Sequence, residues 1–182
     1  MRLLIPALVF ALSFVTLPAG AEVSLFGAPP LVTAVTKNDV AGVRAALIAQ
    51  PNTNYTVGAG KTLLMVAAEN GNAEIAKLLI ESRANPNAQD RIGNTPLIYG
   101  VTSDNVAVID VLIAGGARLN DANKQGLTPL MEAARAGKSV FVQHLLDAGA
   151  KASQTDYTGR TALDWAQDSR NRSTIALLTK AQ

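Results

Sequence analysis

Apolar residues in this chain fall into short groups with the spacing of α-helices, separated by glycine and polar residues. Leu130, Ala133 and Ala134 occupy positions i, i+3 and i+4, which lie on one face of a helix. A denser apolar group follows at 140–146, after Gly137. The pattern predicts two short helices, with a turn at the glycine that ends the first one.

The residues before the first of these helices predict where it begins. Gly126 permits a tight turn with a positive φ, Thr128 can cap the helix, and Pro129 fits its first position. Two such short helices cannot bury their apolar faces alone. Stacking against neighbouring units of the same kind would bury them.

The same unit recurs along the chain with a period of 33 residues. Gly-x-Thr-Pro-Leu occurs at 93–97 and again at 126–130, and the turn glycine, the capping threonine and the leucine keep this step in other units. Such a period is typical of a solenoid and predicts an all-α fold. The predicted units lie near residues 24–56, 57–89, 90–122, 123–155 and 156–182.

These motifs resemble those of ankyrin repeats, and the resemblance covers essentially the whole chain after residue 21. It implies an L-shaped helix–turn–helix unit with β-turn fingers, a role in binding other proteins, and no cofactor. The motifs that carry it, besides Gly-x-Thr-Pro-Leu, are Ala-Ala-x-x-Gly at 67–71 and 133–137, Leu-Leu at 78–79 and 145–146, and Gly-Ala at 116–117 and 149–150.

Some positions depart from the family pattern, which often has His directly after Thr-Pro-Leu. The corresponding residues here are Met65, Ile98, Met131 and Asp164. The loop-bracing hydrogen bonds of that His are therefore expected to be absent. Arg83 stands at a left-handed helix end where later units have glycine, with a strain of about 1 kcal/mol. Gly100 lies inside the first helix of the third unit, which is expected to be the least stable.

The first 21 residues have the pattern of an export signal. Arg2 precedes an apolar run from Leu3 to Leu17, and Ala19-x-Ala21 fits cleavage before Glu22. The run is short for a membrane span of about 20 residues, although a retained anchor and a membrane-tethered scaffold are the alternative. The predicted organisation is a signal peptide at 1–21, an N-terminal capping unit at 22–56, three repeats at 57–155 and a C-terminal capping unit at 156–182.

Composition narrows the possible partners and compartment. The 182 residues are 48% apolar and 16% charged and include no Cys, which favours a folded protein without disulfides or cysteine metal sites. After removal of residues 1–21, 15 basic side chains stand against 14 acidic ones, so neither nucleic acid nor a membrane is expected as a partner. A periplasmic monomer is predicted. Arg170, Arg172 and Lys180 form a basic cluster at the end, either a solvated cap or a contact for an acidic partner.

Residues suited to catalysis are few. His144 is the only His and occupies the column of Leu78 and Val111, which predicts a partly buried structural residue. Asp164 and Asp168 lie one helical turn apart and could hold a cation or position a water. A metal- or small-molecule-dependent hydrolase built on these three residues is the alternative function, but the chain is not expected to be an enzyme.

The predicted partner-binding surface comprises the residues beside the turn glycines and the exposed ends of the first helices. Ile92, Leu127 and Tyr157 are large and apolar at turn tips, which indicates either contact between adjacent fingers or a partner surface. The sequence thus predicts a non-catalytic module that holds, stabilises or inhibits another exported protein over roughly 700–1,000 Å² per partner. The candidate residues are Arg91, Ile92, Asn94, Thr102, Ser103, Lys124, Gln125, Leu127, Arg135, Tyr157, Thr158 and Arg160, joined on the concave side by Glu69, Asn70 and Asp168.

Overall fold

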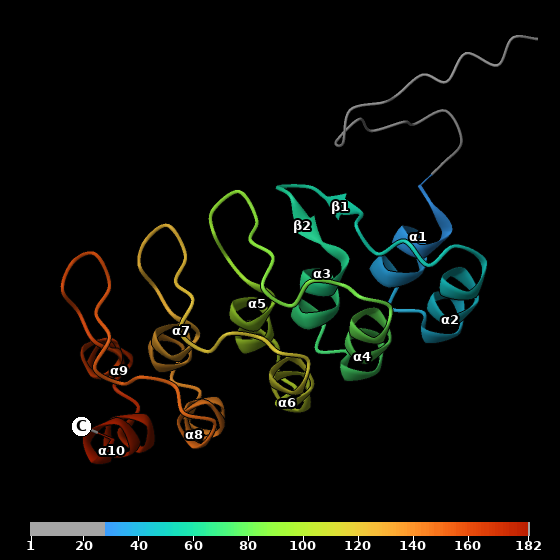
Figure 1. Ribbon diagram of the computed structural model, residues 1–182. Coiled ribbons are helices and arrows are strands. Elements are labelled where there is room, and N and C mark those ends of the chain that lie inside the picture. The colour runs from blue at the N-terminus through green and yellow to red at the C-terminus, as the bar shows by residue number, and fades with distance from the viewer. Residues whose placement is uncertain (1–27, 182) are drawn as a thin grey trace, which may run out of the picture.

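A computed structural model describes residues 28–181, and the signal predicted at 1–21 lies outside them. Within the described part, ten helices form five consecutive pairs that stack side by side (Figure 1). The pairs are α1 (Pro30–Thr36) with α2 (Val40–Ala49), α3 (Leu63–Glu69) with α4 (Ala73–Glu81), α5 (Pro96–Thr102) with α6 (Ala107–Ala114), α7 (Pro129–Arg135) with α8 (Ser139–Asp147), and α9 (Ala162–Ser169) with α10 (Arg172–Lys180).

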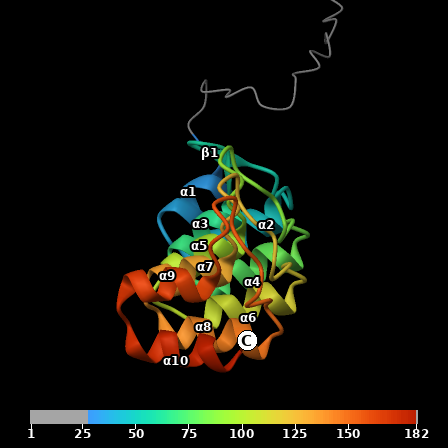
Figure 2. The same ribbon diagram turned by 90° about the vertical axis from the view of Figure 1, so that its left-hand side faces the viewer.

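The pairs build two rows of helices and a row of loops. Helices α1, α3, α5, α7 and α9 form an inner row, the even-numbered helices form an outer row, and the loops between pairs project from the inner row as fingers (Figure 1). The first finger contains the hairpin of β1 (Thr56–Val57) and β2 (Lys61–Thr62), with Thr56 opposite Thr62. Seen along the stack, the fingers lie one behind another (Figure 2). The predicted all-α solenoid with β-turn fingers is confirmed.

Threonine caps start the inner helices α3, α5, α7 and α9, as the sequence predicts, whereas α1 starts after Pro29 without a side-chain cap. Thr95 Oγ1 accepts the backbone N–H of Ile98 at 3.3 Å, and Thr128 accepts that of Met131 at the same distance. Pro96 and Pro129 occupy the first helical positions, where a missing N–H leaves no hydrogen bond unmade. Each cap fixes where a finger ends and a helix begins.

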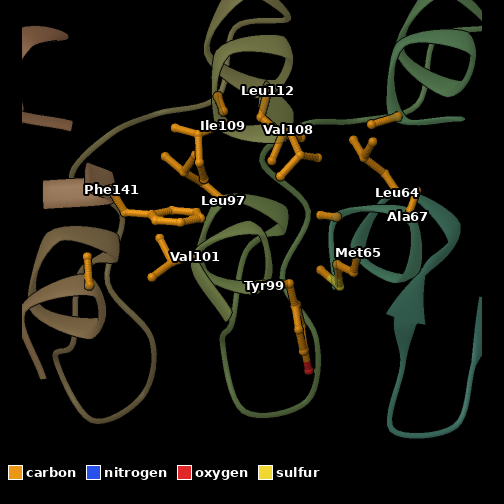
Figure 3. Packing of buried hydrophobic residues seen from close by; sticks show 14 of the residues in the cluster. Leu64, Met65, Ala67, Leu97, Tyr99, Val101, Val108, Ile109, Leu112 and Phe141 are labelled. Atoms are coloured by element: carbon orange, nitrogen blue, oxygen red, sulfur yellow. The ribbon is translucent and has the colours of Figure 1, made fainter. Parts of the chain in front are cut away.

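The core lies between the two helix rows and runs through all the pairs. Leu97 of α5 is fully buried and points toward Ile109 and Leu112 of α6, while Phe141 of α8 reaches back toward Leu97 (Figure 3). Burying a side chain of this size stabilises a fold by about 1.5–3 kcal/mol. Because Phe141 comes from the next pair, this burial depends on the neighbouring unit, as stacking requires.

Gly100 allows α5 and α6 to approach closely. A Cβ at this position would lie 3.0 Å from Cδ1 of Ile109 and 3.2 Å from Cδ1 of Leu112. The α5 helix has seven residues, as α3 and α7 do, so the glycine does not shorten it. Glycine has a low helix propensity but permits this close approach, and the lower stability expected of this helix stays a prediction.

The left-handed helix end predicted at Arg83 is confirmed. Its φ is +67°, and the equivalent Gly116 and Gly149 have φ values of +88° and +95°. A side chain in this region strains the backbone, so Arg83 holds a conformation that favours glycine.

Side chains tie the turn inside each pair to the pair before it. Asn105 donates from Nδ2 to the Gly71 carbonyl at 2.8 Å, and Asn171 does the same to Gly137. Lys138 occupies the equivalent position in the fourth pair. Its Nζ donates to the carbonyls of Thr102, at 3.1 Å, and Ser103, at the end of α5. The lysine therefore caps a helix whose own turn has Asp104 in place of the usual glycine.

Thr174 is a polar residue at an apolar position of the last pair. It lies in the column of Ile75, Val108 and Phe141 and is completely buried. Its Oγ1 has no hydrogen-bond partner within the described residues. The last pair therefore contains a buried hydroxyl that lowers its stability.

Candidate partner-binding surface

The finger tips are joined to one another by backbone hydrogen bonds. The N–H of Arg91 donates to the Ala59 carbonyl at 3.2 Å, that of Lys124 to Ile92 at 3.0 Å, and that of Tyr157 to Gln125 at 3.4 Å. Each bond joins a finger to the one before it. The tips are therefore a connected stack and not a set of independent loops.

Turn glycines make this stacking possible. A Cβ at Gly93 would lie 2.8 Å from the backbone nitrogen of Lys124, and one at Gly126 would lie 2.6 Å from that of Tyr157. Both glycines also have positive φ. The periodic glycine thus serves two purposes, because it permits the turn and lets the next finger approach.

A buried Asp or Asn organises each of the later turns. Asp156 Oδ1 accepts the N–H groups of Thr158 and Arg160 at 2.8 and 3.0 Å. Asp90 and Asn123 make the equivalent pairs of bonds in their own fingers. The side chains at these positions therefore fix the shape of the loops that carry the tip residues.

Aromatic side chains from the inner helices brace two of these turns. The Tyr99 hydroxyl donates to Asp90 Oδ2 at 2.7 Å, and Trp165 Nε1 donates to Asp156 Oδ2 at 3.0 Å. Tyr99 projects from α5 into its finger (Figure 3). No His stands at these positions, and Tyr99 and Trp165, one position after the family's His, supply loop-bracing hydrogen bonds in its place.

The brace affects the titration of its members. Burial raises the pKa of Tyr99, and its hydrogen bond to Asp90 raises it further. Burial opposes ionisation of Asp156, but hydrogen bonds from Thr158, Arg160 and Trp165 outweigh it and lower the pKa of this carboxyl. Asp156 is therefore held in its charged form by the finger it organises.

The concave face, between the fingers and the inner helices, pairs its charges within the chain. Lys61 Nζ lies 2.8 Å from Glu69, Arg135 lies 2.7 Å from Glu132, and Arg160 pairs with Asp168. Lys61 Nζ also lies 4.4 Å from the ring centre of Tyr99, and the Arg160 guanidinium lies 4.0 Å from that of Trp165. These cations are therefore occupied by intramolecular partners.

Opposing effects act on the pKa of Lys61 at this face. Partial burial lowers its pKa, but the hydrogen bond that Lys61 donates to Glu69 and the charges of Glu69 and Tyr99 raise it above the usual value. The lysine is charged at neutral pH and its charge is matched locally.

Two of the predicted surface residues are buried. Leu127 is 5% exposed and belongs to the hydrophobic core, and Ser103 is 5% exposed with its hydroxyl donating to the Gly100 carbonyl. The prediction was wrong for Leu127 because its position returns toward the inner helices. At the same position in other units, Lys61 and Arg160 lie over aromatic rings of that row.

Other predicted residues support the fingers or line the concave side. Asn94 is half-buried and accepts a hydrogen bond from Asn123 Nδ2 at 2.9 Å, which joins adjacent fingers. Thr102 is exposed, but its hydroxyl donates to the Tyr99 carbonyl. Glu69 and Asn70 are exposed at the end of α3.

The remaining predicted residues are exposed together at the tips. Ile92 is 57% exposed and Tyr157 is 77% exposed, although both belong to apolar residue types. We define the finger-tip ridge as these two residues with their exposed neighbours on the three stacked tips: Arg91, Ile92, Lys124, Gln125, Tyr157 and Thr158.

The residues considered for hydrolysis are engaged elsewhere. Asp164 Oδ2 accepts the backbone N–H of Thr161 at 2.7 Å and caps α9, and this hydrogen bond lowers the pKa of the carboxyl. Asp168 pairs with Arg160, and His144 Nδ1 lies 3.2 Å from Asp110 Oδ1 on the outer row. Residues 28–181 contain no cluster of three or more His, Asp or Glu side chains that could hold a metal ion. In the same range, no helix is long and apolar enough to cross a membrane.

Comparison with known proteins agrees with the repeat geometry. No curated protein sequence is significantly similar to this chain. A family sequence model described as ankyrin repeats (3 copies) matches residues 31–123 and 108–182. Ankyrin repeats are protein-interaction modules and are generally non-catalytic. With its five stacked helix pairs and their fingers, the chain belongs to the ankyrin-repeat family.

Proposed function

We propose that the protein is a non-catalytic binding module of the periplasm that holds, stabilises or inhibits another exported protein. The finger-tip ridge is the centre of the binding surface, and the concave face beside it contributes the rim. The mature chain is a monomer and needs no cofactor for this role.

The exposure of Ile92 and Tyr157 on a connected stack is the observation that supports the proposal. Only four large hydrophobic side chains within residues 28–181 are strongly exposed, and two of them lie on the ridge. The other two, Ile48 and Val140, lie apart on α2 and α8 of the outer row. Apolar and aromatic side chains on a pre-ordered surface bind with little loss of conformational entropy.

Export rests on the sequence of residues 1–21. Their charged start, apolar run and small-residue end are typical of a cleaved signal, and a protein without Cys needs no oxidative folding. Intact mass spectrometry of the protein from the cell envelope tests this part. A chain beginning at Glu22 is expected, and a mass that still includes residues 1–21 contradicts it.

Affinity capture from a periplasmic extract of the source organism tests the binding role. The baits are the chain from Glu22, the ridge variant Ile92→Ser/Tyr157→Ser and the control variant Ile48→Ser/Val140→Ser. Both variants exchange two exposed apolar side chains for serine, so circular dichroism should show both folded.

One protein held by the wild type and the control, and lost by the ridge variant, is the expected result. Capture that is equal for all three baits contradicts the assignment to the ridge. A wild-type bait that holds no protein contradicts the binding role itself.

A further inference from the structure

We infer that the ridge recognises an acidic, extended segment of its partner that carries at least one apolar side chain. This inference rests on the proposed function and specifies the chemistry of the partner. It follows from which charges at the surface are already matched and which are not.

Arg91 and Lys124 are the cations of the ridge. Both are exposed, and within residues 28–181 neither lies within ion-pair distance of a carboxylate. The nearest acid to Arg91 in sequence is Asp90, which is buried as an acceptor of finger hydrogen bonds, and the nearest to Lys124 is Asp121, which pairs with Arg118 at 2.7 Å. The ridge itself contains no acidic residue, so its outward face is positive.

The two cations lie at equivalent positions of adjacent fingers. The backbone bond from Lys124 to the Ile92 carbonyl fixes the spacing between these fingers, and Tyr157 takes the same position on the next one. Ile92 follows Arg91, so apolar surface lies beside the positive charge. A segment running along the stack would meet two cations followed by an exposed aromatic ring.

A chain with alternating acidic and apolar residues complements this order of side chains. Carboxylates would pair with Arg91 and Lys124, and an aliphatic or aromatic side chain would pack on Ile92 or Tyr157. Because the fingers are already connected, the ridge would lose little conformational entropy on binding, and the entropy cost would fall mainly on the segment.

A fluorescein-labelled dodecapeptide of alternating Glu and Leu is the probe, and fluorescence anisotropy with the chain from Glu22 is the readout. Saturable binding with a dissociation constant on the order of 100 μM is expected at low salt, weakening as salt is added. A peptide with Lys for Glu and one with Ser for Leu serve as matched probes. Failure of the Glu–Leu peptide to saturate, or equal binding of the three peptides, overturns the inference.

Charge reversal at the ridge locates the contact. Arg91→Glu/Lys124→Glu is expected to weaken probe binding by about tenfold or more, since two attractive contacts become repulsive. Lys151→Glu/Arg172→Glu changes the net charge equally at exposed cations away from the tips and should weaken it by less than about twofold. Equal weakening by the two variants would mean that the probe senses only net charge.

Other polyanions test whether the ridge prefers an acidic polypeptide to a lipid surface or a nucleic acid. Vesicles of phosphatidylglycerol and a single-stranded oligonucleotide are compared with the peptide at equal ionic strength. If either binds more tightly than the peptide and depends on Arg91 and Lys124, the ligand is not an acidic polypeptide and the inference fails.

The captured protein provides a separate test of the same inference. A partner that is lost with Ile92→Ser/Tyr157→Ser but kept with Arg91→Glu/Lys124→Glu supports the binding role and contradicts the acidic segment. The two proposals therefore fail in distinguishable ways.

Discussion

The concave face and the finger-tip ridge both carry positive side chains, but they use them differently. On the concave face Lys61 and Arg160 each reach a carboxylate and an aromatic ring. On the ridge Arg91 and Lys124 meet neither within the described residues. Charged groups that return toward the helices help to hold the fold, whereas those at the turn have neither kind of partner within the described residues.

The largest effect is expected from a substitution that disrupts the stacking of adjacent fingers. Gly126→Ala should lower the free energy of unfolding by about 4 kcal/mol, since it adds left-handed strain to a clash with the backbone of Tyr157. Gly159 has the same φ of +83° but, within the described residues, nothing within 4 Å of an added Cβ. Gly159→Ala should therefore lower it by only about 1 kcal/mol. Urea unfolding followed by circular dichroism measures both.

A similar loss in the two glycine variants would show that the turn conformation alone requires glycine. The close approach of adjacent fingers would then contribute little to stability. The ridge would consist of loops held separately by their own Asp or Asn.

The second prediction removes the side chain that organises the last finger. Asp156→Ala should lower the free energy of unfolding at pH 7 by about 3 kcal/mol, because buried donors lose their acceptor. The folded-state pKa of Asp156 is depressed, so its stabilising contribution is complete above the ordinary carboxyl pKa and is lost as pH falls through the folded value. The difference from wild type should therefore shrink between about pH 5 and pH 2.

Asn123→Ala is the matched control for this titration. It removes the equivalent acceptor for two backbone N–H groups in the neighbouring finger, but the amide carries no charge. Its effect on unfolding should not change over the same pH range. A parallel decline in both variants would assign the pH dependence to other carboxylates.

The third prediction sharpens the contrast by freeing the cations of the concave face. Glu69→Gln/Asp168→Asn removes the acidic partners of Lys61 and Arg160, and loss of these partly exposed ion pairs should change stability by less than about 1 kcal/mol. Binding of the Glu–Leu peptide should nevertheless rise about twofold or more, because the surface beside the ridge becomes positive. Unchanged binding would show that the probe meets the tips alone.

Much of the fold could be predicted from the sequence because its information is periodic. Thr95, Thr128 and Pro129 specify helix starts by local chemistry, and the repeated glycine specifies a turn. Arg83 could be assigned a left-handed conformation by comparison with Gly116 and Gly149. Each of these inferences depends on residues close together in the chain or one period apart.

The residues that were predicted wrongly or not at all make contacts that depend on which way a side chain points in the folded chain. Leu127 and Ser103 lie in segments whose equivalents include polar residues, so their burial was not apparent. Tyr99 and Trp165 lie one residue after the expected brace, and only the path of α5 and α9 brings them to Asp90 and Asp156. The shared spacing of nine residues between each Asp and its aromatic was the signal that could have revealed them.

Lys138 couples the unfolding of the third helix pair to that of the fourth. Its ammonium group belongs to the fourth pair but satisfies carbonyls at the end of α5 in the third. If the fourth pair unfolds, α5 loses its cap at the same moment, so the two pairs should exchange their amide hydrogens as one cooperative unit. The boundary between two repeats is here a place where unfolding is transmitted and not where it stops.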